Sequence, residues 1–338
     1  MKSAVRNTLS RLIGAVLAAA PIISALPSCE SIYDDLPPCD HGVSLRFVYD
    51  YNMEYADAFP SKVDCLTLLV YDADGRYVGT YTETGEALRR EGYRMKLDLE
   101  PGVYRFVAYG GMACEKASFG FVQEPAEGSQ MSDLRTALDA DCLSDDDRRN
   151  LHPLYWGALT LPTGDLYNEG VVRMMKDTNN IRIVLQQMSG DKVDVDDFDF
   201  EITDDNTLFG ADNLTIPCGE VLYRPWARGQ TSMGITDGGR EVVAAFAELS
   251  VSRLMTGNAP RLVVRRRADG RNIIDLPLNN CLMMLKSELY ADMPPQEFLD
   301  RQSEWSVVFF LSGDMSWIKV RTHIKINDWT VRINDSEL

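Results

Sequence analysis

Apolar and polar residues alternate with a period of two along most of the chain after residue 43, which is typical of strands with one buried face. The alternation is plainest in segments 43–49, 93–99, 181–185, 305–311 and 320–326. Segment 154–161 reads as a further strand. We therefore expect these segments to be β-strands whose apolar sides face a core.

Short turn sequences separate the expected strands. Asp74-Gly75, Pro101-Gly102, Asp237-Gly238-Gly239 and Asp269-Gly270 are the clearest. An Asp-Gly pair between alternating segments favours a tight hairpin, because both positions tolerate a positive φ. The spacing leaves no room for crossover helices, so the sequence predicts an all-β, mostly antiparallel fold. Helix is expected only near 133–138 and 295–301.

The chain is long enough for two domains. A polar, acidic stretch at 139–153 predicts a long exposed loop, and a new set of strands begins after Asn168-Glu169-Gly170. We place the boundary there, which predicts one β-sandwich over residues 43–168 and a second over 169–338.

Residues 1–28 have the layout of a secretory signal, with Lys2, Arg6 and Arg11 ahead of an apolar stretch at 12–26. The stretch ends in Leu26-Pro27-Ser28-Cys29, which resembles a bacterial lipobox. In that interpretation Leu26 and Ser28 are read by the signal peptidase, and Cys29 is acylated. An ordinary signal peptide with a cysteine nearby is the alternative.

Lipid on Cys29 would be the membrane attachment. No later segment approaches the roughly 18 to 20 apolar residues of a spanning helix, whereas acyl chains contribute about 0.8 kcal/mol for each buried CH₂. Residues 29–42 read as an acidic linker. Within this linker, four residues resemble a surface-export signal: Glu30, Ser31, Asp34 and Asp35. A solvated acidic linker with no such role is the alternative.

Charge argues against nucleic acid as a partner. The formal net charge is −17, and removal of the signal would make it more negative still, so the basic surface that nucleic acid requires is lacking.

Six cysteines remain once Cys29 is acylated: Cys39, Cys65, Cys114, Cys142, Cys218 and Cys281. An exported protein meets oxidising conditions, so pairing is permitted, although sequence alone does not fix the connectivity. We favour a disulfide between Cys114 and Cys142, because both lie in turn-rich sequence. Buried thiols are the alternative.

The residues that catalysis or metal binding would need are few. Histidine occurs only at His41, His152 and His323, which are far apart in the sequence. The sequence has no H-E-x-x-H, C-x-x-C, G-x-G-x-x-G or Walker motif. We therefore predict no enzyme activity, no catalytic residue, no metal and no cofactor.

Two charged segments have alternative interpretations. Asp194, Asp196, Asp197 and Asp199 offer oxygen ligands for calcium, but alternating acids at the start of a strand are usually a solvated face. Arg265-Arg266-Arg267 offers a cut site for a trypsin-like protease, but more simply ends an exposed hairpin strand.

Several longer phrases resemble the FimB-like and Mfa-like fimbrial subunits of Gram-negative anaerobes. In the first half these are segments 63–75, 99–111 and 154–157; in the second half they are 174–183, 248–254, 296–301 and 324–329. They follow the family's order over nearly the whole chain after Cys29. All are turn or core patterns, so the resemblance indicates an architecture and a role in assembly.

The resemblance implies two tandem transthyretin-like Greek-key β-sandwiches. It also implies a lipid-anchored fimbrial subunit, exposed on the outer membrane, which attaches a fimbria and pairs strands with other subunits. An intact first strand near 43–49 would keep the subunit's own groove closed, and the C-terminal strand would pair with its neighbour.

A second function belongs to another class: a surface adhesin or glycan-binding lipoprotein outside any fimbria. The candidate stacking residues for sugar are the tryptophans Trp156, Trp226, Trp305, Trp317 and Trp329. Of these, Trp305 and Trp329 fall on apolar strand faces, which is typical of core residues.

Overall fold

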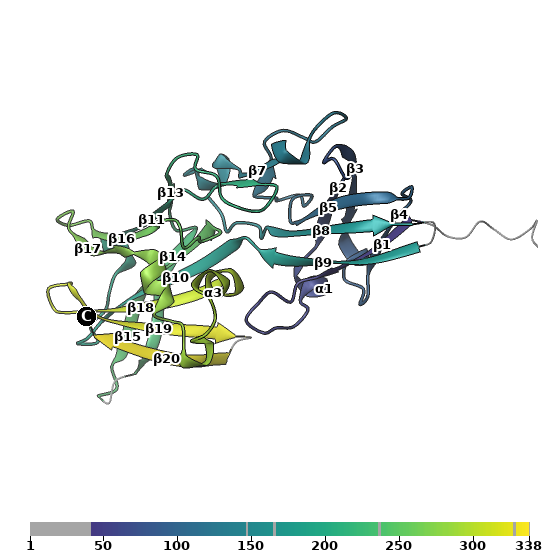
Figure 1. Cartoon of the computed structure of the whole chain (residues 1–338). Coiled ribbons are helices and arrows are strands. Elements are labelled where there is room, and N and C mark those ends of the chain that lie inside the picture. The colour runs from purple at the N-terminus through teal and green to yellow at the C-terminus, as the bar shows by residue number, and fades with distance from the viewer. Residues whose placement is uncertain (1–41, 147, 165–166, 236–237, 327–328, 338) are drawn as a thin grey trace, which may run out of the picture. The chain divides into compact units, whose positions relative to one another are not determined.

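The computed structural model describes residues 42–146, 148–164, 167–235, 238–326 and 329–337, with side chains described as far as Trp317. The predicted signal peptide and residues 29–41 of the predicted linker lie outside this part. Regular structure in the described part is nearly all β-strand (Figure 1). The predicted all-β class is therefore confirmed.

One sheet gathers most strands of the first half of the chain. It contains β1 (Gly42–Val48), β2 (Cys65–Tyr71), β3 (Tyr77–Thr84), β4 (Arg94–Leu97), β5 (Gly102–Gly110), β8 (Tyr155–Thr163) and β9 (Tyr167–Lys176). Their order is β3-β2-β5-β8-β9-β1-β4. All neighbours are antiparallel except β1 and β9, which run parallel over the whole length of β1.

This sheet folds over on itself at the β8–β9 pair. β8 and β9 are paired only from Tyr155 to Gly157, after which they diverge. The side chains of both layers then form one core, with Leu45 of β1, Leu68 of β2 and Phe106 of β5 fully buried. Gly170 shows how close the layers are, since a Cβ there would lie 2.6 Å from Leu159 Cδ2 and 2.9 Å from Leu45 Cδ2.

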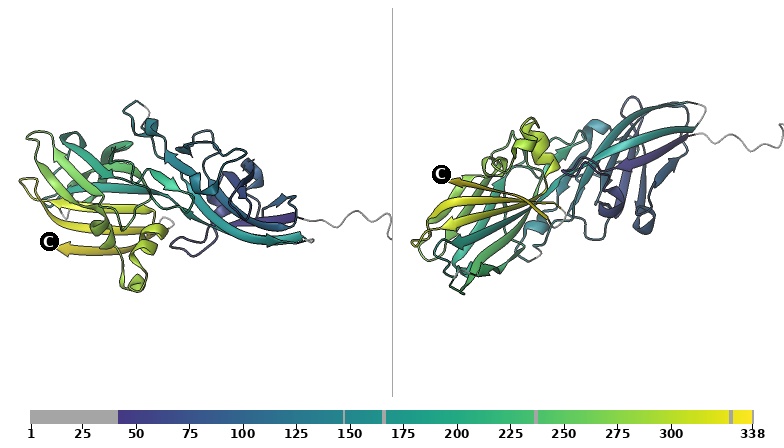
Figure 2. Two further views of the ribbon diagram at one scale, coloured as in Figure 1. Left: turned by 45° about the horizontal axis from the view of Figure 1, so that its top comes forward. Right: turned by 90° about the horizontal axis from the view of Figure 1, so that it is seen from below.

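Two sheets form the second sandwich. The six-stranded sheet contains β10 (Thr178–Gln187), β14 (Ala227–Ile235), β15 (Glu241–Ser252), β18 (Glu304–Leu311), β19 (Trp317–Ile326) and β20 (Trp329–Glu337), in the order β14-β15-β10-β18-β19-β20. The four-stranded sheet contains β11 (Phe198–Asp204), β13 (Val221–Tyr223), β16 (Arg261–Arg266) and β17 (Asn272–Pro277), in the order β13-β11-β16-β17. Figure 2 shows the strands of the larger sheet, green to yellow, side by side.

The facing sides of these two sheets share one core. Ile183, Ala247 and Phe309 of the larger sheet belong to the same buried cluster as Phe200 and Val264 of the smaller one. The periodicity at 181–185 and 305–311 correctly predicted which residues face inward, because period-two alternation places every second side chain on the same face.

A third, small sheet joins the two halves of the chain. It contains β6 (Phe119–Phe121), β7 (Arg135–Leu138) and β12 (Leu208–Gly210), in the order β12-β7-β6. Phe209 of β12 is paired with Thr136 of β7. Tyr109 on the outer face of the first sheet belongs to the same buried cluster as Phe209 and as the core of the second sandwich. The outer face of the first sheet therefore packs on the core of the second sandwich, while the core of the first sandwich remains a separate cluster.

The domain boundary lies later than the sequence predicts. β9 begins at Tyr167 and is paired with β8 and β1, so residues 169–176 belong to the first sheet rather than to the second sandwich. The change of sheet occurs at Asp177, between β9 and β10. The predicted division into 43–168 and 169–338 cuts through β9. The polar sequence at 168–170 resembles a turn, but these residues lie inside the strand.

Helices are short: α1 (Phe59–Lys62), α2 (Leu278–Met283) and α3 (Pro295–Arg301). α3 confirms the prediction, with proline at its first position and Phe298 and Leu299 buried. The helix expected at 133–138 is wrong, since a 3₁₀ turn at Met131–Asp133 leads into β7. Among the described residues, no helix has the length and apolar character to cross a membrane.

The loop expected to be exposed at 139–153 is held down at several points. Cys142 and Leu151 are buried within the core cluster, and a 3₁₀ turn spans Ala140–Leu143. Polar composition alone did not reveal these apolar anchors.

Candidate functional site

The predicted lipidation site lies outside the described residues. This holds for Leu26, Ser28 and Cys29, and for the four sorting candidates Glu30, Ser31, Asp34 and Asp35. They remain predictions from the sequence.

The predicted disulfide is wrong: Cys114 is bonded to Cys65 and not to Cys142. β2 and β5 are antiparallel neighbours, with Leu66 opposite Gly110, so the start of β2 and the loop after β5 meet at the same end of the sheet. The two Cα atoms are 5.5 Å apart, which suits a disulfide. Cys142 is instead buried in the core, with 1% of its surface exposed. The register of β2 with β5 brings Cys65 next to Cys114. The turn-rich composition on which the prediction rested carries no information about strand register.

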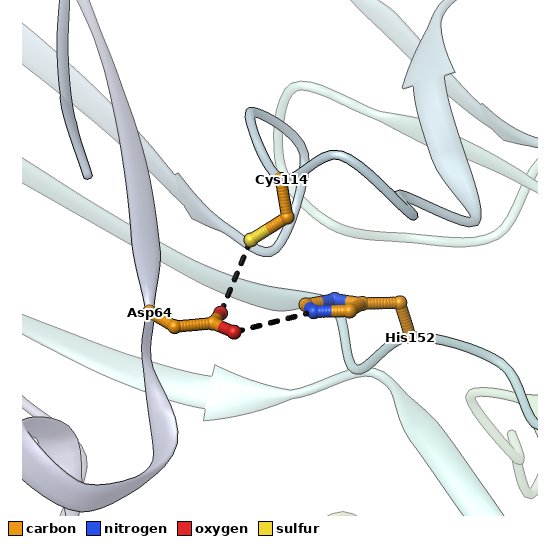
Figure 3. Close-up of side chains that lie close together, drawn as sticks. All are labelled: Asp64, Cys114 and His152. Carbon is orange, nitrogen blue, oxygen red and sulfur yellow. Dashed lines mark hydrogen bonds and ion pairs between the residues drawn. The ribbon is translucent and has the colours of Figure 1, made fainter. Parts of the chain in front are cut away.

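Asp64 and His152 lie beside this disulfide. Asp64 directly precedes β2, and His152 lies just before β8, which is the other neighbour of β5. His152 Nε2 lies 3.6 Å from Asp64 Oδ2, and Cys114 Sγ lies 3.1 Å from Asp64 Oδ1 (Figure 3). A disulfide sulfur carries no proton, so the second contact is a close approach of sulfur and carboxylate and not a donated hydrogen bond.

Gly111 allows the segment that carries His152 to approach. Its φ is +97°, and an added Cβ would lie 2.0 Å from the Pro153 carbonyl oxygen and 3.3 Å from His152 Nδ1. Two hydrogen bonds hold the surroundings: the Gly111 N–H donates to the Cys65 carbonyl at 3.1 Å, and the His152 N–H donates to Ser118 Oγ at 2.8 Å. Nδ1 of His152 is buried and has no hydrogen-bond partner.

A buried charged network lies where the chain passes from the first sheet to the second. Arg253, directly after β15, donates from Nε and Nη2 to the two carboxylate oxygens of Asp300 on α3, each at 2.8 Å. Its Nη1 donates to the Asn213 carbonyl at 2.6 Å. Asn213 Nδ2 in turn donates to Asp177 Oδ1 at 2.9 Å.

Asp177 is the weakly compensated member of this network. Its side chain is fully buried, Oδ2 has no hydrogen-bond partner, and Oδ1 lies 3.9 Å from Arg253 Nε, whose guanidinium is already engaged by Asp300. Burial therefore raises the pKa of Asp177 to about 7, more than Arg253 and Asn213 lower it. Its backbone N–H is satisfied by the Leu154 carbonyl at 2.8 Å.

A loop after β1 contacts α3 near this network. The Arg301 guanidinium lies over the rings of Tyr51 and Tyr55, 4.1 Å and 4.5 Å from their centroids. Tyr55 adopts a φ of 54°, which is uncommon for a residue with a side chain. A cavity of about 300 Å³ adjoins this contact and is lined by Tyr155 and Lys176 among others. The contact ties the first sandwich to the second.

The acidic segment 194–199 and the arginine segment 265–267 both form ion pairs. Asp199 accepts from Arg267 at 2.7 Å, and Asp196 lies 3.2 Å from Arg228 Nη2. Within the described residues, Asp64, Cys114 and His152 are the one group of three or more metal-type ligands that come together, so the four aspartates do not converge on a calcium site. Arg265 and Arg266 end β16 in a hairpin with β17, as the second interpretation of that segment predicted.

Among the tryptophans whose side chains are described, Trp156 and Trp317 are partly buried and pack against the core cluster. Trp305 is buried and donates to Asn179 Oδ1 at 2.9 Å, and Trp317 packs edge-on against Phe309 with ring centroids 5.8 Å apart. Trp226 exposes 37% of its surface. The side chain of Trp329 lies outside the described part.

Sheet ends are the positions at which another chain could be added. β1 lies inside its sheet, between β9 and β4, so its position is filled by the chain's own residues. β20 is the last strand of the six-stranded sheet and β14 is the first. The outer edge of β20 therefore has no neighbour among the described strands.

Two of three comparisons with known proteins found matches to this chain. A family model described as fimbrillin-A associated anchor proteins Mfa1 and Mfa2 matches residues 36–335. The comparison with curated proteins found no match. The solved structures include several similar chains.

A crystal structure of a candidate adhesin from Bacteroides thetaiotaomicron is 62% identical, covers 89% of this chain and 100% of its own, and has a TM-score of 0.82. Another structure from that organism, described as a candidate polysaccharide-binding protein, is 28% identical over 87% of this chain and 99% of its own, with a TM-score of 0.71. The fimbrial anchor protein Mfa2 from Porphyromonas gingivalis shares the fold at 13% identity, with a TM-score of 0.63 over 88% of this chain and 100% of its own.

The family model covers most of the chain, and the resemblance of its turn and core patterns to Mfa-like subunits points the same way. The chain belongs to the family of fimbrillin-A associated anchor proteins Mfa1 and Mfa2.

Proposed function

We propose that this protein is a lipid-anchored fimbrial subunit that attaches a fimbria to the outer membrane and is exposed at the cell surface. Family membership supports a role with fimbriae. The observation that carries the proposal is the placement of two strands. β1 lies inside its sheet with a neighbour on each side, whereas β20 is the last strand of its sheet.

β1 is held as firmly as an internal strand. It pairs along its length with β9 and over four residues with β4. Val43, Leu45 and Phe47 are each at most 2% exposed, and burying side chains of this size contributes roughly 1.5 to 3 kcal/mol apiece. A subunit that keeps this strand has no open groove for an incoming strand, so it ends a fibre.

β20 offers the opposite feature. It pairs with β19 from Trp329 to Glu337, and its other side faces no strand of the described part. An edge strand presents unpaired backbone N–H and C=O groups, which are a template for β-augmentation. We propose that the adjacent fimbrial subunit pairs here.

The attachment to the membrane would be the acylated Cys29, followed by residues 30–41 as a tether. Triton X-114 partitioning of wild type and Cys29→Ala tests this step. We expect the wild type in the detergent phase and the variant in the aqueous phase; equal partitioning of both would reject lipidation.

The finer architecture is part of the same proposal: the two sandwiches are tandem transthyretin-like Greek-key domains. The strand order β3-β2-β5-β8-β9-β1-β4 supports it, because strands distant in sequence are neighbours. We further propose that the subunit has no catalytic activity and acts without a cofactor.

Deletion of Thr330–Leu338 tests the docking edge. We expect fibres in the medium while the truncated lipoprotein still reaches the surface. Fibre antigen is measured in cells and in supernatant, with surface accessibility of the truncated protein as the control. Fibres that stay cell-attached would show that docking uses another surface.

A second function, adhesion without incorporation into a fimbria, is favoured by the descriptions of the 62% and 28% identical relatives as adhesin and polysaccharide-binding candidates. A pull-down from cell envelopes separates the two. Co-purifying fimbrial subunits support the anchor, whereas glycan-array binding without such subunits supports the adhesin.

A further inference from the structure

The end of the first sheet where β2, β5 and β8 meet brings together a disulfide, a carboxylate and an imidazole. Asp64, Cys114 and His152 offer one ligand atom each, and these atoms lie within 4.8 Å of one another. Figure 3 shows the Cys114 sulfur and the His152 ring on two sides of the Asp64 carboxylate. Cys65 belongs to the same place through its bond to Cys114.

The three ligand atoms are near enough to one another to form a tetrahedral zinc site after side-chain rotation. Zinc binds sulfur at about 2.3 Å and nitrogen or oxygen at about 2.0 to 2.2 Å, so its ligand atoms lie roughly 3.3 to 3.8 Å from one another. The observed separations are 3.6 Å between His152 Nε2 and Asp64 Oδ2, and 3.1 Å between Cys114 Sγ and Asp64 Oδ1. These two contacts use different oxygens of Asp64, and the three ligand atoms lie within 4.8 Å of one another. Side-chain rotations that move the ligand atoms by about 1 Å, with separation of the two sulfurs once their bond is broken, would meet that geometry.

The backbone around these residues is fixed from several sides. Gly85 N–H donates to the Asp64 carbonyl at 3.0 Å, and Gly111 N–H donates to the Cys65 carbonyl at 3.1 Å. The segment of His152 is held by Ser118 at 2.8 Å. These bonds involve no ligand atom, so they would persist when the disulfide opens.

The disulfide itself keeps the two sulfurs from binding metal. In the disulfide neither sulfur is a thiolate, and the thiolate is the form that binds metal. We propose that the Cys65–Cys114 disulfide is one of two alternative states, and that reduction by a thiol turns this sheet end into a zinc site made by Cys65, Cys114, His152 and Asp64.

The chemistry balances in two steps. Two molecules of a low-molecular-weight thiol are oxidised to their disulfide while Cys65 and Cys114 gain two electrons and two protons as thiols. Zn²⁺ then displaces both thiol protons and takes the sulfurs, the His152 nitrogen and an Asp64 oxygen as ligands. Disulfide and zinc exclude each other. This inference is independent of the fimbrial proposal.

Co²⁺ is the probe, since its binding to thiolate gives a charge-transfer absorption that oxygen or nitrogen ligands do not give. The full-length protein in detergent carries Cys39→Ser and Cys218→Ser, which remove thiols outside the site; Cys142 and Cys281 are buried. We expect the reduced protein to bind one equivalent with the thiolate band and the oxidised protein to show none. His152→Ala should weaken binding at least about tenfold, Cys114→Ser should weaken the band because only Cys65 remains as a thiol, and the double variant Cys65→Ser/Cys114→Ser should abolish it.

Two further measurements keep the result decisive if reduction loosens the fold. Cys65→Ser leaves Cys114 as a thiol without any reductant, so the folded variant should bind Co²⁺ with a weaker thiolate band. Zn²⁺ should raise the unfolding midpoint of the reduced protein and leave that of the oxidised protein unchanged. A reduced protein that is silent towards Co²⁺, a folded but silent Cys65→Ser, a band that survives the double variant Cys65→Ser/Cys114→Ser, or unfolding on reduction that Zn²⁺ does not prevent would each overturn the proposal.

Discussion

Asp177 should make the stability of the protein depend on pH in a direction opposite to that of most carboxylates. Its pKa is raised by burial from 3.8 to about 7. Between these values the native state holds a proton that the unfolded state has released. The free energy of unfolding therefore falls as pH rises through this window.

The size of the effect follows from the two pKa values. One pKa unit corresponds to about 1.36 kcal/mol, so the full window corresponds to about 4 kcal/mol. Between pH 5.5 and 8, where most proteins can be measured, the loss from Asp177 alone should be about 2 kcal/mol. Loss on that scale is a large part of the stability of an ordinary domain.

Asp177→Asn isolates this contribution. Asn keeps an oxygen that can accept from Asn213 and carries no charge at any pH, while Arg253 keeps both hydrogen bonds to Asp300. We expect wild type and variant to have similar free energies of unfolding at pH 5.5 and the variant to be more stable by about 2 kcal/mol at pH 8. Urea unfolding at both pH values, followed by circular dichroism, measures the difference.

Asp204→Asn provides the matched control. The pKa of Asp204 is also raised, to about 6, chiefly by burial, so this variant should remove a separate part of the pH dependence and leave the Asp177 part in place. An Asp177→Asn variant with the same pH dependence as the wild type would refute the reasoning and show that Asp177 stays ionised in the native state.

Further predictions test the core, the sheet end and the cysteine pairing. Phe309→Ala should lower the free energy of unfolding by about 3 to 5 kcal/mol, because the ring is fully buried and packs on Trp317. Val103→Ala, at a site 43% exposed, should change it by no more than about 0.5 kcal/mol. Equal effects of the two substitutions in denaturant unfolding would contradict the core assignment. Gly111→Ala should lower the thermal midpoint more than Gly92→Ala, since both have a positive φ but only Gly111 has the Pro153 oxygen in the way; a harmless Gly111→Ala would mean that segment 152–153 lies elsewhere. Non-reducing peptide mapping should link Cys65 to Cys114, and a Cys114–Cys142 peptide would contradict the register of β2 and β5.

Local pattern predicted much of the fold. Alternation located β1, β4, β10, β18 and β19, and Pro295 correctly marked the start of α3. Such features depend on neighbours in the sequence, which is why they can be read from it. The segment 133–138 was misread as helix because its six residues are too few to separate a period of two from one of 3.6.

Features that depend on distant residues escaped prediction. The parallel pairing of β1 with β9 joins residues more than a hundred positions apart, and the network of Asp177, Arg253 and Asp300 unites three separate segments. Burial gives Asp177 its unusual pKa, and nothing in its immediate sequence reports burial. The predicted cysteine pairing was also wrong because the disulfide depends on distant residues: it follows from the register of β2 with β5.

The central claim is that this subunit attaches a fimbria to the cell through lipid on Cys29. The most direct test is the distribution of fibres between cells and medium in a strain whose only copy of the gene carries Cys29→Ala, with equal total fibre antigen in both strains as the control. We predict that fibres move from the cells to the medium and that the variant protein co-purifies with them. Fibres that remain on the cells while the variant protein is released alone would contradict it.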